Sequence, residues 1–261
     1  MNDRSRRRVL ITGADGDIGS ILWDGLRDRY ELRALTHHAA GIPSVVGDVS
    51  DLESIRPAFD AVDAVIHLAG NSHVTAAWES VLSANIVGVR NVYEAAVDAG
   101  VSLVVYASSN HAIGMYEIDG APEIYRPGHG RMYDEHVDPR PDSLYGVSKV
   151  FGEAMGRYYV DRRGLRVICL RIGAVGEVDD PDAPLGVEAV PSATPTPELR
   201  RARHEAIWLS HRDCVSLFAA ALEADNVDWA VVYGVSDNAA RFWSLESAER
   251  LLGWRPQDGA R

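Results

Sequence analysis

Short apolar runs alternate with stretches of helical repeat along most of the chain, which has 261 residues. The apolar runs are continuous, as in strands that are buried on both faces of a parallel sheet. We place these strands at residues 8–12, 30–35, 45–49, 64–70, 101–107, 165–172 and 231–235. One helical stretch follows residue 19, and another ends near Gly100. Two more run from Tyr145 to about Arg162 and from Asp213 to Leu222, and the last covers 245–252. This alternation predicts an α/β fold with helices on both faces of one sheet.

Two segments break the alternation. Residues 114–142 are rich in proline, glycine, tyrosine and charge, and a loop of this length at a strand end predicts a lid over a binding site. Residues 174–199 are rich in proline and acidic residues and show neither the repeat of a strand nor that of a helix. This composition predicts an exposed excursion from the fold. A basic patch, Arg200 to His204, follows the excursion.

A glycine-rich turn stands between the first strand and the first helix. Its residues are Gly13, Gly16, Asp17, Ile18 and Gly19. Glycines here allow a tight turn, let the backbone approach a pyrophosphate and let the helix pack closely, while the N–H groups at the helix start face the phosphates. With a strand before it and a helix after it, the turn predicts a dinucleotide site rather than a plain structural turn.

The end of the second strand carries Thr36 and His37, where an aspartate would select NAD by accepting from the ribose 2′-hydroxyl. Without that carboxylate, Arg33, Thr36 or the histidines could accommodate a 2′-phosphate, and NAD could equally bind without the hydrogen bond, so the cofactor is NAD or NADP. Asp48, at the end of the third strand, either touches the adenine or caps the following helix. We assign the rest of the cofactor site to Val49, Leu68, Ala69, Gly70 and Asn85, together with Tyr145 and Lys149.

Tyr145 and Lys149 stand four residues apart in a helical stretch, so the phenol and the ammonium share one face about one turn apart. A nearby cation favours the phenolate of a tyrosine whose pKa would otherwise be about 10, so the pair can act as a base. The chain has 26 lysines and arginines, and Lys149 is the only lysine among them. A chance pairing on a solvated helix is the alternative, and the neighbouring motifs decide against it.

Composition excludes several classes of partner. The net charge of -12 disfavours nucleic acid and anionic membranes, and the apolar runs are far shorter than the roughly twenty residues that span a bilayer. The start of the chain shows no hydrophobic signal stretch. Cys169 and Cys214 lie in apolar settings without metal-type spacing, so we expect no metal site and a reducing, cytoplasmic location.

With the glycine turn, a serine at a strand end and the Tyr145/Lys149 pair in order, the chain resembles the extended short-chain dehydrogenase/reductase superfamily. The strings SSNHAIG, SLYGVSKVFGE, RIG, WLSHRD and LGWRPQD are similar to those of uronate dehydrogenases and of haloarchaeal NAD-dependent glucose-6-phosphate dehydrogenases. The resemblance implies a Rossmann-type doubly wound parallel sheet formed by residues 1–173 and about 205–235. Residues 174–204 and 236–261 would then form a small C-terminal substrate lobe.

The resemblance also implies a reaction and a set of substrate residues. The reaction is oxidation at C1 of an anionic pyranose, glucose 6-phosphate or a hexuronate, to the lactone without a metal. Tyr145 is then the base, Lys149 its electrostatic partner and ribose ligand, and Ser109 a hydrogen-bond donor to the reacting oxygen. The sugar site would further include Ser72, Asn110, His111 and Arg203, whose guanidinium would bind the anionic group at the C6 end through two parallel hydrogen bonds.

The chain departs from these relatives in places. Besides the missing aspartate, Ala174 stands where uronate dehydrogenases offer a serine to the substrate, and the excursion before Arg203 is longer. Two other functions share the fold. A nucleotide-sugar epimerase or dehydratase would need a larger substrate lobe, and a dehydratase would need acids where this chain has Asn110 and His111. A non-catalytic dinucleotide sensor would not need Tyr145, Lys149 and Ser109.

Two helices carry more apolar surface than one sheet face requires. The apolar residues are Val89, Val92, Ala95 and Ala96 before Gly100, and Val150, Ala154 and Tyr158 after Tyr145. Because relatives pair such helices across a two-fold axis, we expect a homodimer or a higher homo-oligomer.

Overall fold

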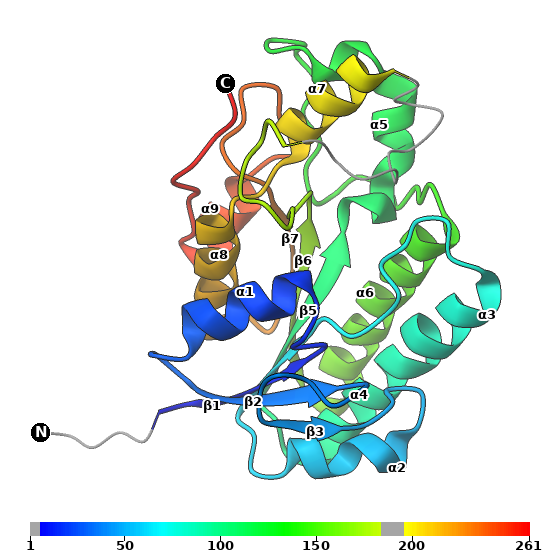
Figure 1. Ribbon diagram of the computed structural model, residues 1–261, viewed down its shortest axis with the longest axis vertical. Coiled ribbons are helices and arrows are strands. Elements are labelled where there is room, and N and C mark those ends of the chain that lie inside the picture. The colour runs from blue at the N-terminus through cyan, green and yellow to red at the C-terminus, as the bar shows by residue number, and fades with distance from the viewer. Residues whose placement is uncertain (1–5, 184–195) are drawn as a thin grey trace, which may run out of the picture.

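The computed structural model describes residues 6–183 and 196–261. Among these residues, seven strands, all parallel, form one sheet in the order β3-β2-β1-β4-β5-β6-β7 (Figure 1). The order runs outward from β1 in both directions, so the predicted doubly wound sheet is confirmed. The strands are β1 (Arg8–Thr12), β2 (Glu31–Thr36), β3 (Ser44–Val46), β4 (Ala64–His67), β5 (Leu103–Ser109), β6 (Arg166–Ile172) and β7 (Trp229–Gly234).

Helices cover both faces of the sheet, as Figure 1 shows. One face packs against α1 (Asp17–Leu26), α8 (His211–Glu223) and α9 (Glu246–Leu252). The other packs against α2 (Leu52–Ile55), the short helix η1 (Arg56–Phe59), α4 (Gly88–Asp98) and α6 (Leu144–Arg163). Successive strand residues point to opposite faces, so that Val9 and Ile11 belong to the first core and Leu10 to the second. Because both faces are buried, the strands are continuously apolar.

A third apolar cluster lies under α5 (Gly114–Gly120) and α7 (Pro197–Ile207), which are drawn side by side at the top of Figure 1. It includes Tyr125, Phe242 and Trp243, and two short helices, η3 (Asn110–Ile113) and η4 (Glu123–Tyr125), lead into it. The small lobe therefore takes in residues that we had assigned to the dinucleotide-binding part. Conversely, α9 lies outside this cluster, because Ala248 packs in the core of the main sheet.

The two irregular segments contain more helix than the sequence predicts. Residues 114–142 include α5 and η4, so this segment is not a simple loop. The basic patch Arg200 to His204 lies inside α7, which Thr196 begins by accepting a hydrogen bond from Leu199 N. Residues 184–195 of the excursion lie outside the described part of the chain.

One predicted helix start was wrong. The last long helix, α8, begins at His211, because Ser210 caps it by accepting from Asp213 N at 3.0 Å. The Asp213 carboxylate is buried and accepts from Ser236 Oγ at 2.7 Å instead. Of the two roles left open for Asp48, the helix cap is not observed, because Asp51 is the residue that caps α2.

The helical pattern through Asn85 and Gly88 is confirmed. It is divided into α3 (Trp78–Ser80), a π-helical segment η2 (Val81–Val87) and α4. No helix in the described ranges combines the length and the apolar character needed to cross a bilayer.

The apolar residues expected to pair two copies of the chain divide into two groups. Val89, Val92, Ala95 and Ala96 are buried in the chain's own core, so these four need no partner. Of the other three, Val150 is half-buried, and Ala154 and Tyr158 are exposed. Tyr158 belongs to an exposed face that it forms with Leu82 and Val87 of η2 and with Leu144 and Val147 of α6, each 38% to 52% exposed. We propose that a second copy covers this face, because η2 and α6 lie against each other and form one surface.

Val147→Glu places a charge at the centre of the proposed contact and should give a monomer. Light scattering of the parent should return twice the chain mass of 28.5 kDa, and the variant that mass itself. Val178→Glu is the matched control, because Val178 is 62% exposed but lies outside α6 and η2. A monomeric parent at micromolar concentration would remove the proposal.

Candidate active site

A cavity of about 1180 Å³ opens at the carboxyl ends of the strands, where parallel sheets of this kind bind ligands. It is lined by the glycine turn, the ends of β2, β4 and β5, the start of α6 and part of α7. Every residue assigned from the sequence to the cofactor, the substrate or catalysis lines this cavity, with the exception of Asn85.

Asn85 lies behind the cavity wall. Its Oδ1 accepts from Asn71 N at 2.7 Å, and its Nδ2 donates to Asn71 O at 2.9 Å and to Ser148 Oγ at 3.0 Å. Because the amide is fully engaged, Asn85 joins the segment after β4 to α6 and does not itself contact the cavity. The sequence placed Asn85 in the correct region but gave it the wrong role.

The glycine turn has the shape that a dinucleotide requires. Gly13 adopts a φ of +70° and Gly19 has no room for a side chain, since a Cβ there would lie 2.3 Å from Gly13 O. Gly16 offers no side-chain cap to α1, so the first N–H groups of this helix face the cavity. The residues present therefore fit a pyrophosphate.

Next to the end of β2, the cavity contains a carboxylate that this strand does not itself supply. Asp48 Oδ2 lies 3.6 Å from His37 Nε2, and the backbone N–H of Ser50 keeps the pKa of Asp48 below its usual value. Arg33 points away, donating to the carbonyls of Ala58 and Asp60. Because the Asp48 carboxylate lies beside His37 and Arg33 is engaged elsewhere, we expect NAD to bind better than a cofactor with a 2′-phosphate.

Lys149 is held beneath Tyr145. Its Nζ donates to Ala107 O at 2.7 Å and lies 5.2 Å from the centre of the Tyr145 ring. Burial lowers the pKa of Lys149 to about 8, against the smaller opposing effect of Glu153. The predicted spacing of the pair is confirmed, since both residues lie in the first turns of α6.

Three residues at the end of β5 face the same space. Ser109 Oγ accepts from His111 N at 3.2 Å. Asn110 Nδ2 is buried and has no hydrogen-bond partner among the described residues, so it is a donor available to a ligand. His111 Nδ1 lies 2.7 Å from Asp142 Oδ2.

Arg203 lines the cavity but is not available in the way the sequence suggested. Its Nε and Nη2 both donate to the Glu117 carboxylate, which is fully buried and also accepts from Tyr125 Oη at 2.8 Å. The two parallel hydrogen bonds expected for a substrate are therefore made to Glu117. Only Nη1 makes no hydrogen bond to a described residue.

Sequence reasoning missed the buried carboxylates Glu117, Asp142 and Glu153. Glu153 accepts from Ser108 Oγ at 2.6 Å and from Arg171 at 2.9 Å, behind the end of β5. Their basic partners Arg203, His111 and Arg171 lie at least 18 residues away, so no local pattern marks these pairs. The one available signal was for Asp142, which directly precedes the α6 cap Ser143.

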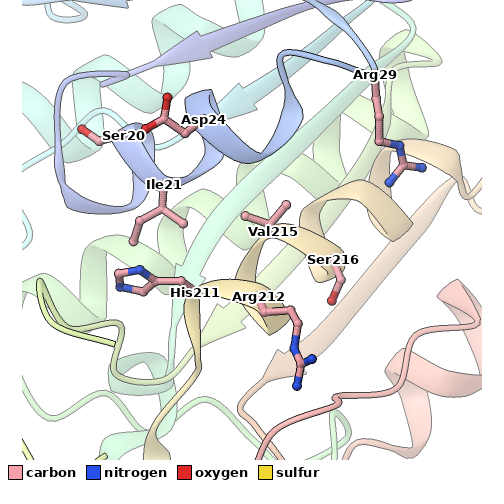
Figure 2. A pocket seen from close by; sticks show the side chains of 8 residues that line it. All are labelled: Ser20, Ile21, Asp24, Arg29, His211, Arg212, Val215 and Ser216. Atoms are coloured by element: carbon pink, nitrogen blue, oxygen red, sulfur yellow. The ribbon is translucent and has the colours of Figure 1, made fainter. Parts of the chain in front are cut away.

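A second cavity, of about 590 Å³, lies between α1 and α8 (Figure 2). Its polar side chains have other partners. Arg212 pairs with Asp258, and His211 Nε2 lies 2.8 Å from Gly176 O. It shares no residue with the glycine turn or with Tyr145, and we do not assign it a role.

A protein-family model described as NAD dependent epimerase/dehydratase family matches residues 9–231. An NAD-dependent glucose-6-phosphate dehydrogenase of Haloferax volcanii is 40% identical over 97% of this chain and 94% of the relative. An L-arabinose 1-dehydrogenase (NAD(P)(+)) of the same organism is 39% identical over 97% of both. A uronate dehydrogenase variant from Agrobacterium tumefaciens, solved in complex with NAD, is 31% identical with a TM-score of 0.78, and the match covers 98% of this chain and 86% of that one.

Lys149→Met should stabilise the fold at pH 7, because the buried ammonium is costly. Its pKa is about 8 in the folded chain against 10.5 as the ordinary value. The unfolded chain therefore binds more protons between these pH values, and the parent gains stability as pH rises through that window. We expect the variant to exceed the parent in free energy of unfolding by on the order of 3 kcal/mol at pH 7.

Urea unfolding of both proteins at pH values from 7 towards 10.5 measures this difference. The excess should be largest at and below pH 8 and should shrink as pH approaches 10.5. An excess that does not change with pH would show that the packing of methionine, and not the buried charge, is responsible.

Proposed function

The chain belongs to the NAD dependent epimerase/dehydratase family, and we propose that it oxidises the C1 hydroxyl of an anionic sugar to the lactone with NAD. The observation that carries this proposal is the placement of Tyr145, Lys149 and Ser109 on the wall of the cavity that also contains the glycine turn. Relatives named for the oxidation of glucose 6-phosphate, L-arabinose and uronates support it.

The residues at the cavity wall divide the chemistry between them. When bound, the nicotinamide supplies the acceptor for the hydride that leaves C1. Tyr145 takes the proton of the C1 hydroxyl as general base, and the charge of Lys149 favours the phenolate that does so. Ser109 donates a hydrogen bond to the same sugar oxygen, and Asn110 Nδ2 provides a second donor to the sugar. The products are the lactone, the reduced cofactor and one proton.

The positive charge of Arg203 on the cavity wall bears on which sugar the protein binds. Arg203 is fixed by Glu117, so its orientation does not depend on the substrate. We propose that Nη1 of this immobilised guanidinium binds the carboxylate or phosphate of a hexuronate or a sugar 6-phosphate. This contact is weaker than the two parallel bonds first expected, since Glu117 offsets part of the charge.

The location of the enzyme is a further part of the proposal. Cys169 and Cys214 are both buried and free, and burial raises the pKa of the Cys214 thiol to about 12. Thiols of this kind suit a reducing compartment, and we propose the cytoplasm.

A panel of sugars tests the proposed function. The purified protein is mixed with NAD and, in turn, with neutral aldoses, uronates, sugar phosphates and nucleotide sugars, and the absorbance of the reduced nicotinamide is followed. Oxidation of a free sugar or a sugar phosphate supports the proposal. Conversion of a nucleotide sugar without net reduction of NAD would identify an epimerase. NAD binding without turnover of any sugar would indicate a non-catalytic dinucleotide sensor.

Tyr145→Phe removes the general base and should lower kcat by about 10² to 10⁴. The affinity for NAD, measured by calorimetry, should stay close to that of the parent, because the phenyl ring remains. Tyr116→Phe is a matched control, since Tyr116 packs against Tyr133 in the small lobe. If Tyr145→Phe kept most of the parent's activity, the assignment of the base would be wrong.

The double variant Glu117→Gln with Arg203→Gln should remove the preference for anionic sugars. Replacing both residues avoids leaving a buried carboxylate unpaired. The ratio of kcat/KM for glucose 6-phosphate over glucose should fall by about 10- to 100-fold, as expected for one charged hydrogen bond.

Arg201→Gln is the control for this double variant. Arg201 lies on the same helix but is exposed and pairs with Asp182 and Glu205, so the substrate preference should not change. If the parent shows no preference for an anion, the role of Arg203 in binding one is wrong. If the double variant slows both sugars equally, the pair acts through the fold.

A further inference from the structure

Asp142 and His111 form a pair beside the proposed base. The Asp142 side chain is 1% exposed and that of His111 is 12% exposed, with 2.7 Å between Oδ2 and Nδ1. The His111 ring meets the Tyr145 ring edge-on, and the ring centres are 5.8 Å apart. Both His111 and Tyr145 line the large cavity, so the pair lies where a sugar would lie.

The Asp142 carboxylate has no freedom to move away. Its Oδ1 accepts from Ser143 Oγ at 2.9 Å, and that same hydroxyl caps α6 by accepting from Gly146 N at 3.0 Å. On the other side, a Cβ at Gly114 would lie 1.9 Å from Asp142 Oδ2, so the backbone itself closes the pocket around the carboxylate. The carboxylate is thus part of the same rigid unit as the helix that carries Tyr145.

The contact between the two side chains determines which ring nitrogen of His111 carries the proton. An ionised carboxylate only accepts hydrogen bonds, so Nδ1 must donate to it. In the neutral ring, Nε2 then has a free lone pair. Nδ1 of His111 pairs with Asp142, whereas Nε2 forms no hydrogen bond with a described residue. His111 therefore presents an acceptor to the cavity.

We propose that Asp142 is a positioning residue, which holds His111 so that Nε2 accepts a hydrogen bond from a hydroxyl of the sugar. Asn110 Nδ2, at the end of β5, has no partner among the described residues and supplies a donor to the sugar, whereas Ser109 Oγ donates to Asn110 Oδ1. A sugar hydroxyl needs acceptors as well as donors, and the pair of Asp142 and His111 supplies one. This inference rests on the proposed sugar oxidation, which gives the cavity a ligand rich in hydroxyl groups.

Asp142→Asn should reverse the polarity of His111. An amide can donate to Nδ1, which moves the ring proton to Nε2 and turns the acceptor into a donor. We expect kcat/KM for the sugar to fall by about 10- to 100-fold, with unchanged NAD affinity. Asp119→Asn is the matched control, because Asp119 lies on α5 but is exposed and pairs with Arg140.

Monodeoxy sugars distinguish positioning from a merely structural role. In the parent, one deoxy analogue should be a poorer substrate than the full sugar by about 10-fold or more, because it lacks the hydroxyl that donates to Nε2. In Asp142→Asn this difference should disappear, while the other deoxy analogues keep theirs. A difference that persists in the variant would overturn the proposal.

Proton NMR gives a second readout that needs no substrate. The short Nδ1–H contact to the carboxylate should give a low-field imidazole resonance in the parent and in the Asp119→Asn control. The resonance should be lost in His111→Gln, which identifies its source. Its absence from the parent would overturn the proposal even if Asp142→Asn does not fold. A parent that shows the resonance but oxidises no sugar would instead contradict the proposed function.

Discussion

The site depends on how closely α6 approaches the carboxyl end of β5. A Cβ at Gly146 would lie 2.2 Å from His111 O, and one at Gly152 would lie 2.2 Å from Tyr106 Oη, so the helix could not come this near with any side chain at these positions. Because α6 lies so close to β5, the Lys149 ammonium reaches the carbonyl oxygen of Ala107 within the core. Tyr145, Lys149 and the residues after β5 are therefore held by the close packing of α6 against β5, which leaves them little room to move.

Buried ion pairs join the elements around this contact. Glu153 joins α6 to Arg171 of β6, and Glu117 joins α5 to Arg203 of α7. Such pairs contribute little net stability, because both charges lose their hydration, but removal of one partner leaves an uncompensated charge. Their value in this protein is geometric. The cavity wall near Arg203 is formed by segments far apart in the chain, and the ion pair between Glu117 and Arg203 fixes α5 against α7.

The fold could be predicted because its signals are local. A strand buried on both faces is apolar along its whole length, and the glycine turn and the spacing of Tyr145 and Lys149 are each contained within a few residues. The contacts that complete the site are not local. Glu117 and Arg203 are 86 positions apart, so their pairing could not be predicted from a single sequence. Helix α7 was missed for a related reason, since it follows a proline-rich stretch without a hydrophobic repeat and is held by contacts with the small lobe.

The use of one lysine in a chain with 26 basic residues has a practical consequence for spectroscopy. Growth on lysine labelled with nitrogen-15 at its side chain would place the isotope in a single ammonium, and that ammonium lies beneath Tyr145. Its signal would need no assignment, because there is no other lysine to confuse it with. Titrating cofactor, sugar or acid into such a sample would report the charge state of this group directly, which in most enzymes is obscured by lysines on the surface.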